Sequence, residues 1–157
     1  VYPLLPDEVL ATASRPDSAW GRSSKEKSSR RSIFIHVKRS LLHPMLQAFD
    51  MADTDNPCPV RFNTIQPTQA LTLLNSDFSE RQAKSFADRL ENEHSNTRDR
   101  IRACMLIVSQ KAPAPQRVDE NLSFFENLKS EHDLNDRQAL EIFCLMALNL
   151  TETIHID

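Results

Sequence analysis

Apolar residues recur with helical spacing over most of the second half of the chain. Residues 83–90, 101–108 and 118–128 each carry apolar side chains three or four positions apart, the pattern of an amphipathic helix with one buried face. The three stripes consist of Ala83, Phe86, Ala87 and Leu90; of Ile101, Cys104, Met105 and Val108; and of Val118, Leu122, Phe125 and Leu128. Residues 139–150 are apolar on nearly every side, so we expect this last helix to be the most buried, with Leu145 and Leu148 in the core.

Residues at the ends of these segments indicate where the helices start and stop. Ser79 with Gln82, and Asn135 with Gln138, have the spacing of a capping box, and Thr97 is a candidate cap for the helix between them. The prolines of "KAPAP" separate the second and third stripes. An earlier helix is expected to begin at Pro67 and to end before Asn75 and Ser76, with an apolar face formed by Ala70, Leu71, Leu73 and Leu74.

The N-terminal third is less regular. Short helices are predicted within residues 1–13 and 43–50, each with a proline in a first-turn position. Residues 14–31 are rich in Ser, Arg and Lys without periodicity and predict a mobile basic loop, anchored by Trp20 docking on the core. Residues 32–38, "SIFIHVK", alternate like a strand, but no comparable segment pairs with them, so a lone extended segment fits equally well. The expected fold is mainly α, with about five or six helices and an extended or short-strand N-terminal third.

Length and composition narrow the class of protein. A chain of 157 residues is expected to form a single domain, residues 1–157, and because it opens on Val1 rather than Met we expect it to be a piece of a longer protein. The single glycine, Gly21, excludes glycine-rich phosphate loops, dinucleotide-binding motifs and a nucleophile elbow. No apolar run approaches the length of a membrane span.

Charge is unevenly distributed although the net charge is only −3. Residues 22–39 hold seven cations against one acid, Glu26. A nucleic-acid arm is one interpretation; a basic segment docked on an acidic helical body is the other. We favour internal docking and expect no nucleic-acid partner, because neither aromatic interleaving nor a groove-reading motif accompanies the run.

Histidine and cysteine spacing predicts no metal site and no cofactor in this chain. The five histidines are dispersed, and none has a ligand partner at metal-binding spacing. There is no Cys-x-x-Cys, and therefore no zinc knuckle and no haem-attachment motif. Cys104 and Cys144 fall on predicted buried faces and are expected to be thiols, with a disulfide between them as the alternative; Cys58 lies in a proline-rich loop.

The segment "RFNTIQPTQALTLLNSDF", residues 61–78, concentrates polar side chains in front of a helix. Such residues cap first-turn N–H groups and hold loops in place; they can also form a pocket for an anion or a sugar at the helix N-terminus. Physical arguments alone favour a structural role for these polar residues over a binding site. In the structural interpretation Arg61 pairs with Asp50, because a guanidinium makes two parallel bonds to one carboxylate.

Three segments together resemble a known family. "RRSIFIHVKRSLLHPMLQAFD", "CPVRFNTIQPTQALTLLNSDF" and "FCLMALNLTETIHID" are similar to the planctomycete-type C-terminal domain known as domain of unknown function 1553. The resemblance implies a recurring framework, and with it candidate binding residues, made of Arg31, Arg39, Asp50, Arg61, Thr64, Gln69 and Asn75. It also implies an exported multidomain bacterial protein with a cytochrome-c-like module upstream, where any haem would reside.

No catalytic motif is present, so whether the chain is an enzyme stays open. The leading hypothesis is a structural or binding domain at the periplasm or cell surface, linked to polysaccharide processing, whose partners are upstream domains of the same chain and a polysaccharide. One alternative is an enzyme or a glycan-binding or anion-binding domain that uses the polar segment from Arg61 to Asn75. Another is a docking module for the upstream cytochrome-like domain.

Overall fold

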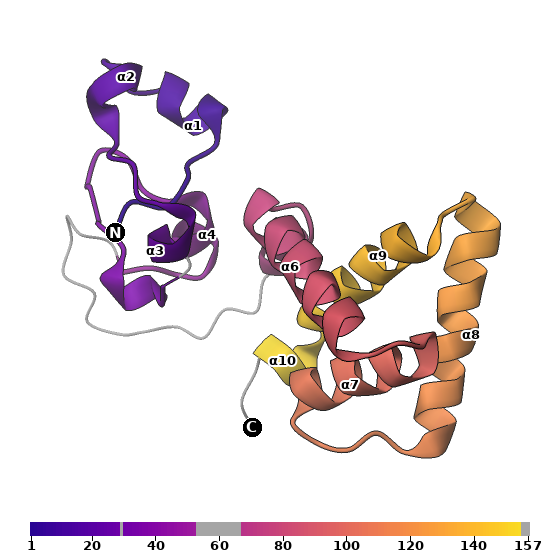
Figure 1. Ribbon diagram of the computed structural model, residues 1–157. Coiled ribbons are helices and arrows are strands. Elements are labelled where there is room, and N and C mark those ends of the chain that lie inside the picture. The colour runs from indigo at the N-terminus through magenta and orange to yellow at the C-terminus, as the bar shows by residue number, and fades with distance from the viewer. Residues whose placement is uncertain (29, 53–66, 155–157) are drawn as a thin grey trace. The chain divides into compact units, whose positions relative to one another are not determined.

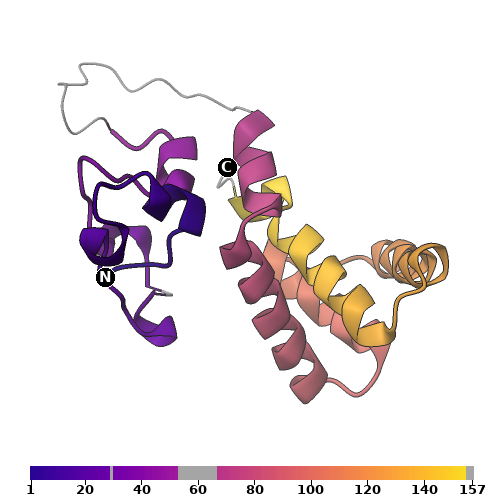
Figure 2. The ribbon, with the colours of Figure 1, turned by 90° about the horizontal axis from the view of Figure 1, so that it is seen from above.

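The chain folds as a series of helices in two compact units, Val1–Gln69 and Ala70–Asp157 (Figures 1 and 2). The structure is a computed structural model that describes residues 1–28, 30–52 and 67–154. Within these ranges every regular element is a helix, and an isolated β-bridge joins Lys38 and Leu41. The mainly α class is confirmed. The expectation of a single domain stays a prediction.

The second unit contains the long helices. They are α6 (Asp77–Glu93), α7 (Thr97–Ser109), α8 (Pro115–His132) and α9 (Asp136–Leu148), followed by the short α10 (Thr151–Ile154). α9 packs against α6, α7, α8 and α10, which confirms that the last long helix is the central one (Figure 1). These neighbours explain most of its apolar sequence, although Ile142 is 40% exposed.

The core of this unit is formed by the predicted stripes. Ala87, Leu90, Ile101 and Cys104 are fully buried, and Phe125 from α8 joins them. From α9 the buried residues are Ala139, Leu140, Phe143, Cys144 and Ala147. Leu145 and Leu148, which were expected in the core, are partly buried side chains that pack against it and are not among its buried residues.

Two of the predicted helix starts are displaced along the chain. α6 begins after Ser76, whose Oγ accepts from the Ser79 N–H at 3.1 Å, so the predicted cap at Ser79 is wrong and Ser79 is itself buried in the first turn. α7 is capped by Asn96 rather than by Thr97. The capping box of Asn135 and Gln138 is confirmed at the start of α9, with both reciprocal hydrogen bonds present.

An arginine on α9 ties this helix to α6. The Arg137 guanidinium lies 2.7 Å from an Asp88 oxygen and 2.6 Å from a Glu91 oxygen, both on α6. It also contacts Glu141 on its own helix at 2.8 Å and donates to the Lys84 carbonyl oxygen at 3.2 Å. The hydrogen bonds to these carboxylates, led by that of Glu141, raise the pKa of Arg137, so its charge is permanent.

The first unit is built from short helices joined by extended chain. These are α1 (Asp7–Ala11), α2 (Pro16–Ala19), α3 (Lys25–Ser28), the 3-10 helix η1 (Ser32–Phe34) and α4 (Pro44–Ala48). Residues 14–31, expected as a loop, therefore contain α2 and α3; their mobility stays a prediction. The expected helices within residues 1–13 and 43–50 are confirmed as α1 and α4.

The segment 32–38 is partly helical rather than a strand. Its first three residues form η1, and the chain becomes extended at Ile35. There it pairs with the first residue of the chain: the His36 N–H donates to the Val1 carbonyl oxygen at 2.8 Å, and the Val1 amino nitrogen donates to the Phe34 carbonyl oxygen at 2.9 Å. Ile33 is 80% exposed, so the apolar alternation does not mark a buried face.

An aromatic cluster takes the place of a large core in this unit. The Tyr2, Trp20 and His36 rings contact one another with centroid separations of 4.7 to 5.8 Å, and the Trp20 Nε1–H donates to the Pro3 carbonyl oxygen at 2.8 Å. Trp20 is thus an anchor within the first unit, where it docks on Tyr2 and His36. The buried aliphatic residues in the described part of the unit are Leu5 and Leu41.

The helix α5 (Pro67–Leu74) lies at the boundary between the units. It starts at Pro67 and ends before Asn75 as predicted. Its predicted apolar face is partly exposed, because Leu71 and Leu74 are 56% and 41% exposed. None of its described side chains belongs to the main core cluster.

Candidate functional site

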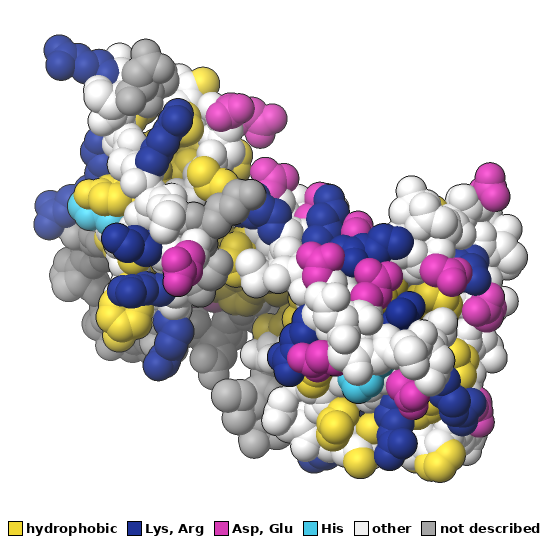
Figure 3. All heavy atoms as spheres, viewed as in Figure 1, with side chains coloured by type: hydrophobic (Ala, Val, Ile, Leu, Met, Phe, Trp, Pro, Cys, Tyr) yellow, Lys and Arg dark blue, Asp and Glu magenta, His cyan; other side chains and the backbone are white. Residues whose placement is uncertain are grey.

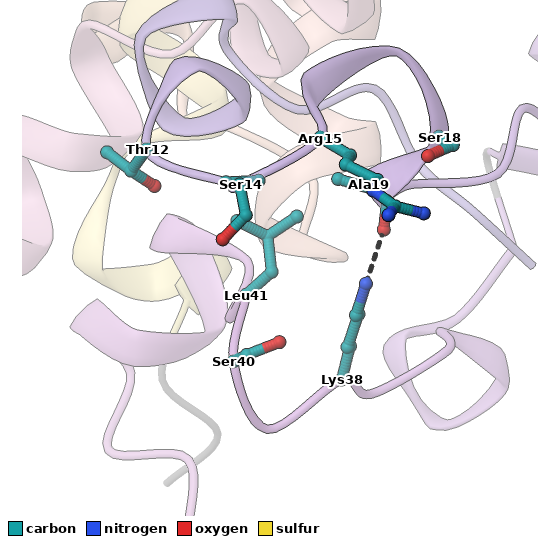
Figure 4. A pocket seen from close by; sticks show the side chains of 9 residues that line it. Thr12, Ser14, Arg15, Ser18, Ala19, Lys38, Ser40 and Leu41 are labelled. Atoms are coloured by element: carbon teal, nitrogen blue, oxygen red, sulfur yellow. Dashed lines mark hydrogen bonds between the residues drawn. The ribbon is translucent and has the colours of Figure 1, made fainter.

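A pocket of about 480 Å³ lies within the first unit (Figure 4). Two stretches of chain form it: the link after α1 together with the second half of α2, and the turn that follows residue 37. The described residues that line it are Thr12, Ala13, Ser14, Arg15, Ser18, Ala19, Lys38, Ser40 and Leu41. Most of these side chains end in a hydroxyl or a cationic group.

Local sequence explains the shape of the first wall. α1 ends at Ala11, and the Thr12 hydroxyl donates to the Val9 carbonyl oxygen at 2.7 Å. The next helix starts at Pro16, since proline favours a first helical position, and Arg15 precedes it with non-helical backbone angles. The short link between the helices therefore presents Ser14 and Arg15 side by side at the pocket (Figure 4).

The second wall is a tight turn. The Leu41 N–H donates to the Lys38 carbonyl oxygen at 3.1 Å, and Leu41 is buried with 4% exposure, which fixes the turn to the body of the unit. The Lys38 side chain reaches across the pocket, and its Nζ donates to the Ala19 carbonyl oxygen at 2.9 Å (Figure 4). Lys38 thus links the two walls directly.

The electrostatic character of the pocket is positive. Arg15 and Lys38 contribute two cations, while no Asp, Glu or His occurs among the described lining residues. The described residues also give neither cation an acidic partner. Figure 3 shows further Lys and Arg side chains over the first unit on the side viewed, whereas acidic and basic side chains alternate over the second unit. An anion in the pocket would meet both charges without competition from a carboxylate in the wall.

The predicted framework residues are placed as follows. Arg31 is exposed at the start of η1, Arg39 is exposed in the turn beside Lys38, and Asp50 is exposed with a left-handed φ of 52°. Gln69 lies in α5, and Asn75 follows that helix, where its N–H donates to the Leu71 carbonyl oxygen. Arg61 and Thr64, with Cys58, lie outside the described residues, so the predicted Arg61–Asp50 pair stays a prediction.

The titratable residues do not assemble a metal site in the part of the chain that the structure describes. His43 is the histidine whose environment changes its chemistry: burial lowers its pKa, and a backbone hydrogen bond with Leu4 opposes that shift. Its Nδ1 is buried without a partner among the described atoms. No helix in the described ranges is both long and apolar enough to cross a membrane.

The chain matches a known protein family over most of its length. Residues 5–125 match the family described as PSD1, a protein of unknown function (DUF1553). The chain belongs to the DUF1553 family. The match contains every residue of the pocket and all seven framework residues, and it ends within α8. No curated protein and no solved structure matches the chain.

The pocket residues of this DUF1553 domain were not singled out as a site by sequence reasoning. The resemblance pointed to Arg39, whereas the pocket uses the neighbouring Lys38. Arg15 and the surrounding serines were assigned to a loop, because four-residue helices such as α2 carry too few positions to show periodicity. The sequence feature that could have indicated the pocket is the excess of cations and hydroxyl residues between positions 12 and 40.

Proposed function

We propose that this DUF1553 domain is a binding domain for an acidic polysaccharide, and that the pocket between Arg15 and Lys38 holds one carboxylated or sulfated sugar of it. The observation that carries the proposal is the composition of the pocket: two cations, four hydroxyl side chains and no acidic group among its described lining residues. Arginine binds carboxylate and sulfate through two parallel hydrogen bonds, and lysine adds a compact charge.

The hydroxyl groups suit the rest of such a sugar. The hydroxyls of Thr12, Ser14, Ser18 and Ser40 can each donate and accept, as sugar hydroxyls do. A volume of about 480 Å³ lies within the range of small-ligand pockets and accommodates a monosaccharide unit.

The pocket favours binding over catalysis. Hydrolysis or elimination at a sugar requires a general acid or base, normally a carboxylate or a histidine, within hydrogen-bonding reach of the reacting atoms. The described lining residues offer neither. The resemblance supports a setting for this role in an exported, multidomain bacterial protein that processes cell-surface polysaccharide.

The test is a comparison of two single substitutions by isothermal titration calorimetry. The probes are polygalacturonate and a sulfated polysaccharide, with neutral dextran as the blank. Arg15→Ala should weaken binding by about tenfold or more, since hydrogen bonds to charged groups contribute roughly 1.5 to 3 kcal/mol. Lys27→Ala removes an exposed cation of the same unit outside the pocket and should change the affinity by less than about twofold.

The control separates a pocket from a diffuse basic surface. If both substitutions weaken binding equally, charge alone is responsible and the pocket assignment is wrong. If neither polysaccharide binds the unmodified domain, the proposed function is wrong. The Arg15 side chain does not cap α2 and has no acidic partner among the described residues, so its removal should leave the melting temperature nearly unchanged.

A further inference from the structure

Two cysteines face each other at the centre of the second unit. Cys104 lies on α7 and Cys144 on α9, two helices that pack together (Figure 1). Both side chains are fully buried in the same core cluster, and both are free thiols in this structure. Neither contributes to the pocket in the first unit, so the proposed function leaves them unexplained.

The two thiols are close enough to interact directly. Interaction with Cys144, followed by burial, raises the pKa of the Cys104 thiol. Both cysteines belong to one buried cluster between helices that pack together, and cysteine is small enough to let helix backbones approach closely. A raised pKa keeps the Cys104 thiol protonated in the folded protein, and thiols react with oxidants chiefly as thiolates.

We propose that Cys104 and Cys144 are a disulfide site that closes while the chain folds in the presence of a disulfide oxidant and becomes shielded once the core has formed. One thiolate attacks the oxidant, such as oxidised glutathione, and forms a mixed disulfide with release of one reduced thiol. The second thiolate attacks this intermediate and forms the Cys104–Cys144 bond with release of the other. The two protein thiols lose two electrons and two protons in total, and the oxidant disulfide is reduced to two thiols.

The positions of the two cysteines predict that the bond would have a large effect on stability. It would join α7 to the central helix across a long loop that contains all of α8. A crosslink over a long loop restricts the unfolded chain strongly, so the oxidised unit should melt at a higher temperature. The same burial that hides the thiols would protect the completed bond from reductants. The site would thus report the redox state of the compartment in which the chain folded.

The experiment refolds the chain from denaturant with oxidised glutathione, and in parallel with a reductant only. The Cys58→Ser variant leaves Cys104 and Cys144 as its two cysteines, and Cys58→Ser/Cys144→Ala is the matched control with one. Alkylation in denaturant followed by mass spectrometry counts the thiols, and proteolysis identifies linked peptides. Circular dichroism verifies that each sample has refolded. The unmodified chain is mapped in the same way, so the result does not depend on one variant.

The expected result is a Cys104–Cys144 linked peptide after oxidative refolding and a melting temperature about 8 °C or more above that of the reduced protein. Reduced protein that is already folded should oxidise at least about tenfold more slowly. The proposal is overturned if both thiols remain alkylatable after oxidative refolding to the helical state. It is also overturned if the link joins separate chains or involves Cys58 in place of either residue, or if folded and refolding protein oxidise at the same rate.

Discussion

Gly21 is required at its position because of a neighbouring side chain and not because of its own backbone conformation. It has no left-handed φ, so the usual reason for a glycine is missing. A Cβ built there would lie 2.7 Å from Cδ2 and 2.8 Å from Cγ of the Tyr2 ring, closer than carbon atoms can approach. The ring is itself held by Trp20 and His36. Gly21 is therefore needed so that the chain can pass over the face of Tyr2.

We therefore expect Gly21→Ala to destabilise the first unit by about 1 to 3 kcal/mol, the usual cost of forcing an extra group into a packed site. Trp20 is the single tryptophan of the chain and belongs to the affected cluster, so its fluorescence during urea unfolding follows this unit directly. The control repeats the substitution in a Tyr2→Ala background. If the ring is the obstacle, Gly21→Ala should cost much less there; an equal cost in both backgrounds would refute the explanation.

At the scale of helices, sequence patterns were sufficient where a helix was long enough to show a period. The stripe from Ile101 to Val108 is buried at every predicted position, and the capping box at Asn135 is present. The caps of α6 and α7 lie three residues and one residue before the predicted ones. Ser76 and Asn96 are as suitable for capping as Ser79 and Thr97, and only tertiary packing decides between them. The short helices α2 and α3 gave no periodic signal at all.

The candidate site was less predictable than the helices. Its cations and hydroxyls come from positions between 12 and 41 that converge only through the Lys38–Ala19 contact and the turn at Leu41. Such contacts depend on tertiary structure, which no local pattern encodes. The exposure of Leu71 has a related reason, since periodicity predicts an apolar face but not whether another element covers it.

The packing of α9 against α6 leads to a prediction about ion pairs. Arg137 is 32% exposed and contacts two carboxylates of α6 and one of its own helix. Arg89 on α6 pairs with Glu93 alone among the described residues, and both of these side chains are about half exposed. A network of ion pairs that joins two helices should contribute more to the free energy of unfolding than a single exposed pair that solvent screens. Arg137→Ala should therefore lower the free energy of unfolding by about 1 to 2 kcal/mol, and Arg89→Ala by less than about 0.5.

Chemical denaturation followed by circular dichroism measures both variants under the same conditions. Adding about 0.5 M NaCl should reduce the difference between Arg137→Ala and the unmodified protein, since salt screens partly exposed charges. Equal losses for the two variants would show that the Arg137 network adds nothing beyond an ordinary surface pair.

At the scale of the whole molecule, the family match and the hydrophobic core have different boundaries. The DUF1553 match ends at residue 125, within α8, and so excludes α9 entirely. Yet α9 supplies Leu140, Phe143 and Cys144 to the core and contacts every other helix of the second unit from α6 onward. The segment that the family match covers therefore cannot complete this core by itself.

This difference predicts how fragments of the chain will behave. All members of the main core cluster lie between Ala83 and Leu150, inside the unit Ala70–Asp157. A fragment of residues 70–157 should therefore be helical and melt cooperatively on its own, because it retains its whole core. A fragment of residues 70–135 keeps α6, α7 and α8 but loses α9, which exposes the apolar faces that α9 covers; it should lack a cooperative transition and bind a hydrophobic dye. Circular dichroism melts and dye fluorescence of the two fragments, beside the full chain, measure this. If the shorter fragment melts cooperatively, α9 is dispensable for this fold. If the longer fragment does not melt cooperatively, the unit depends on residues before 70.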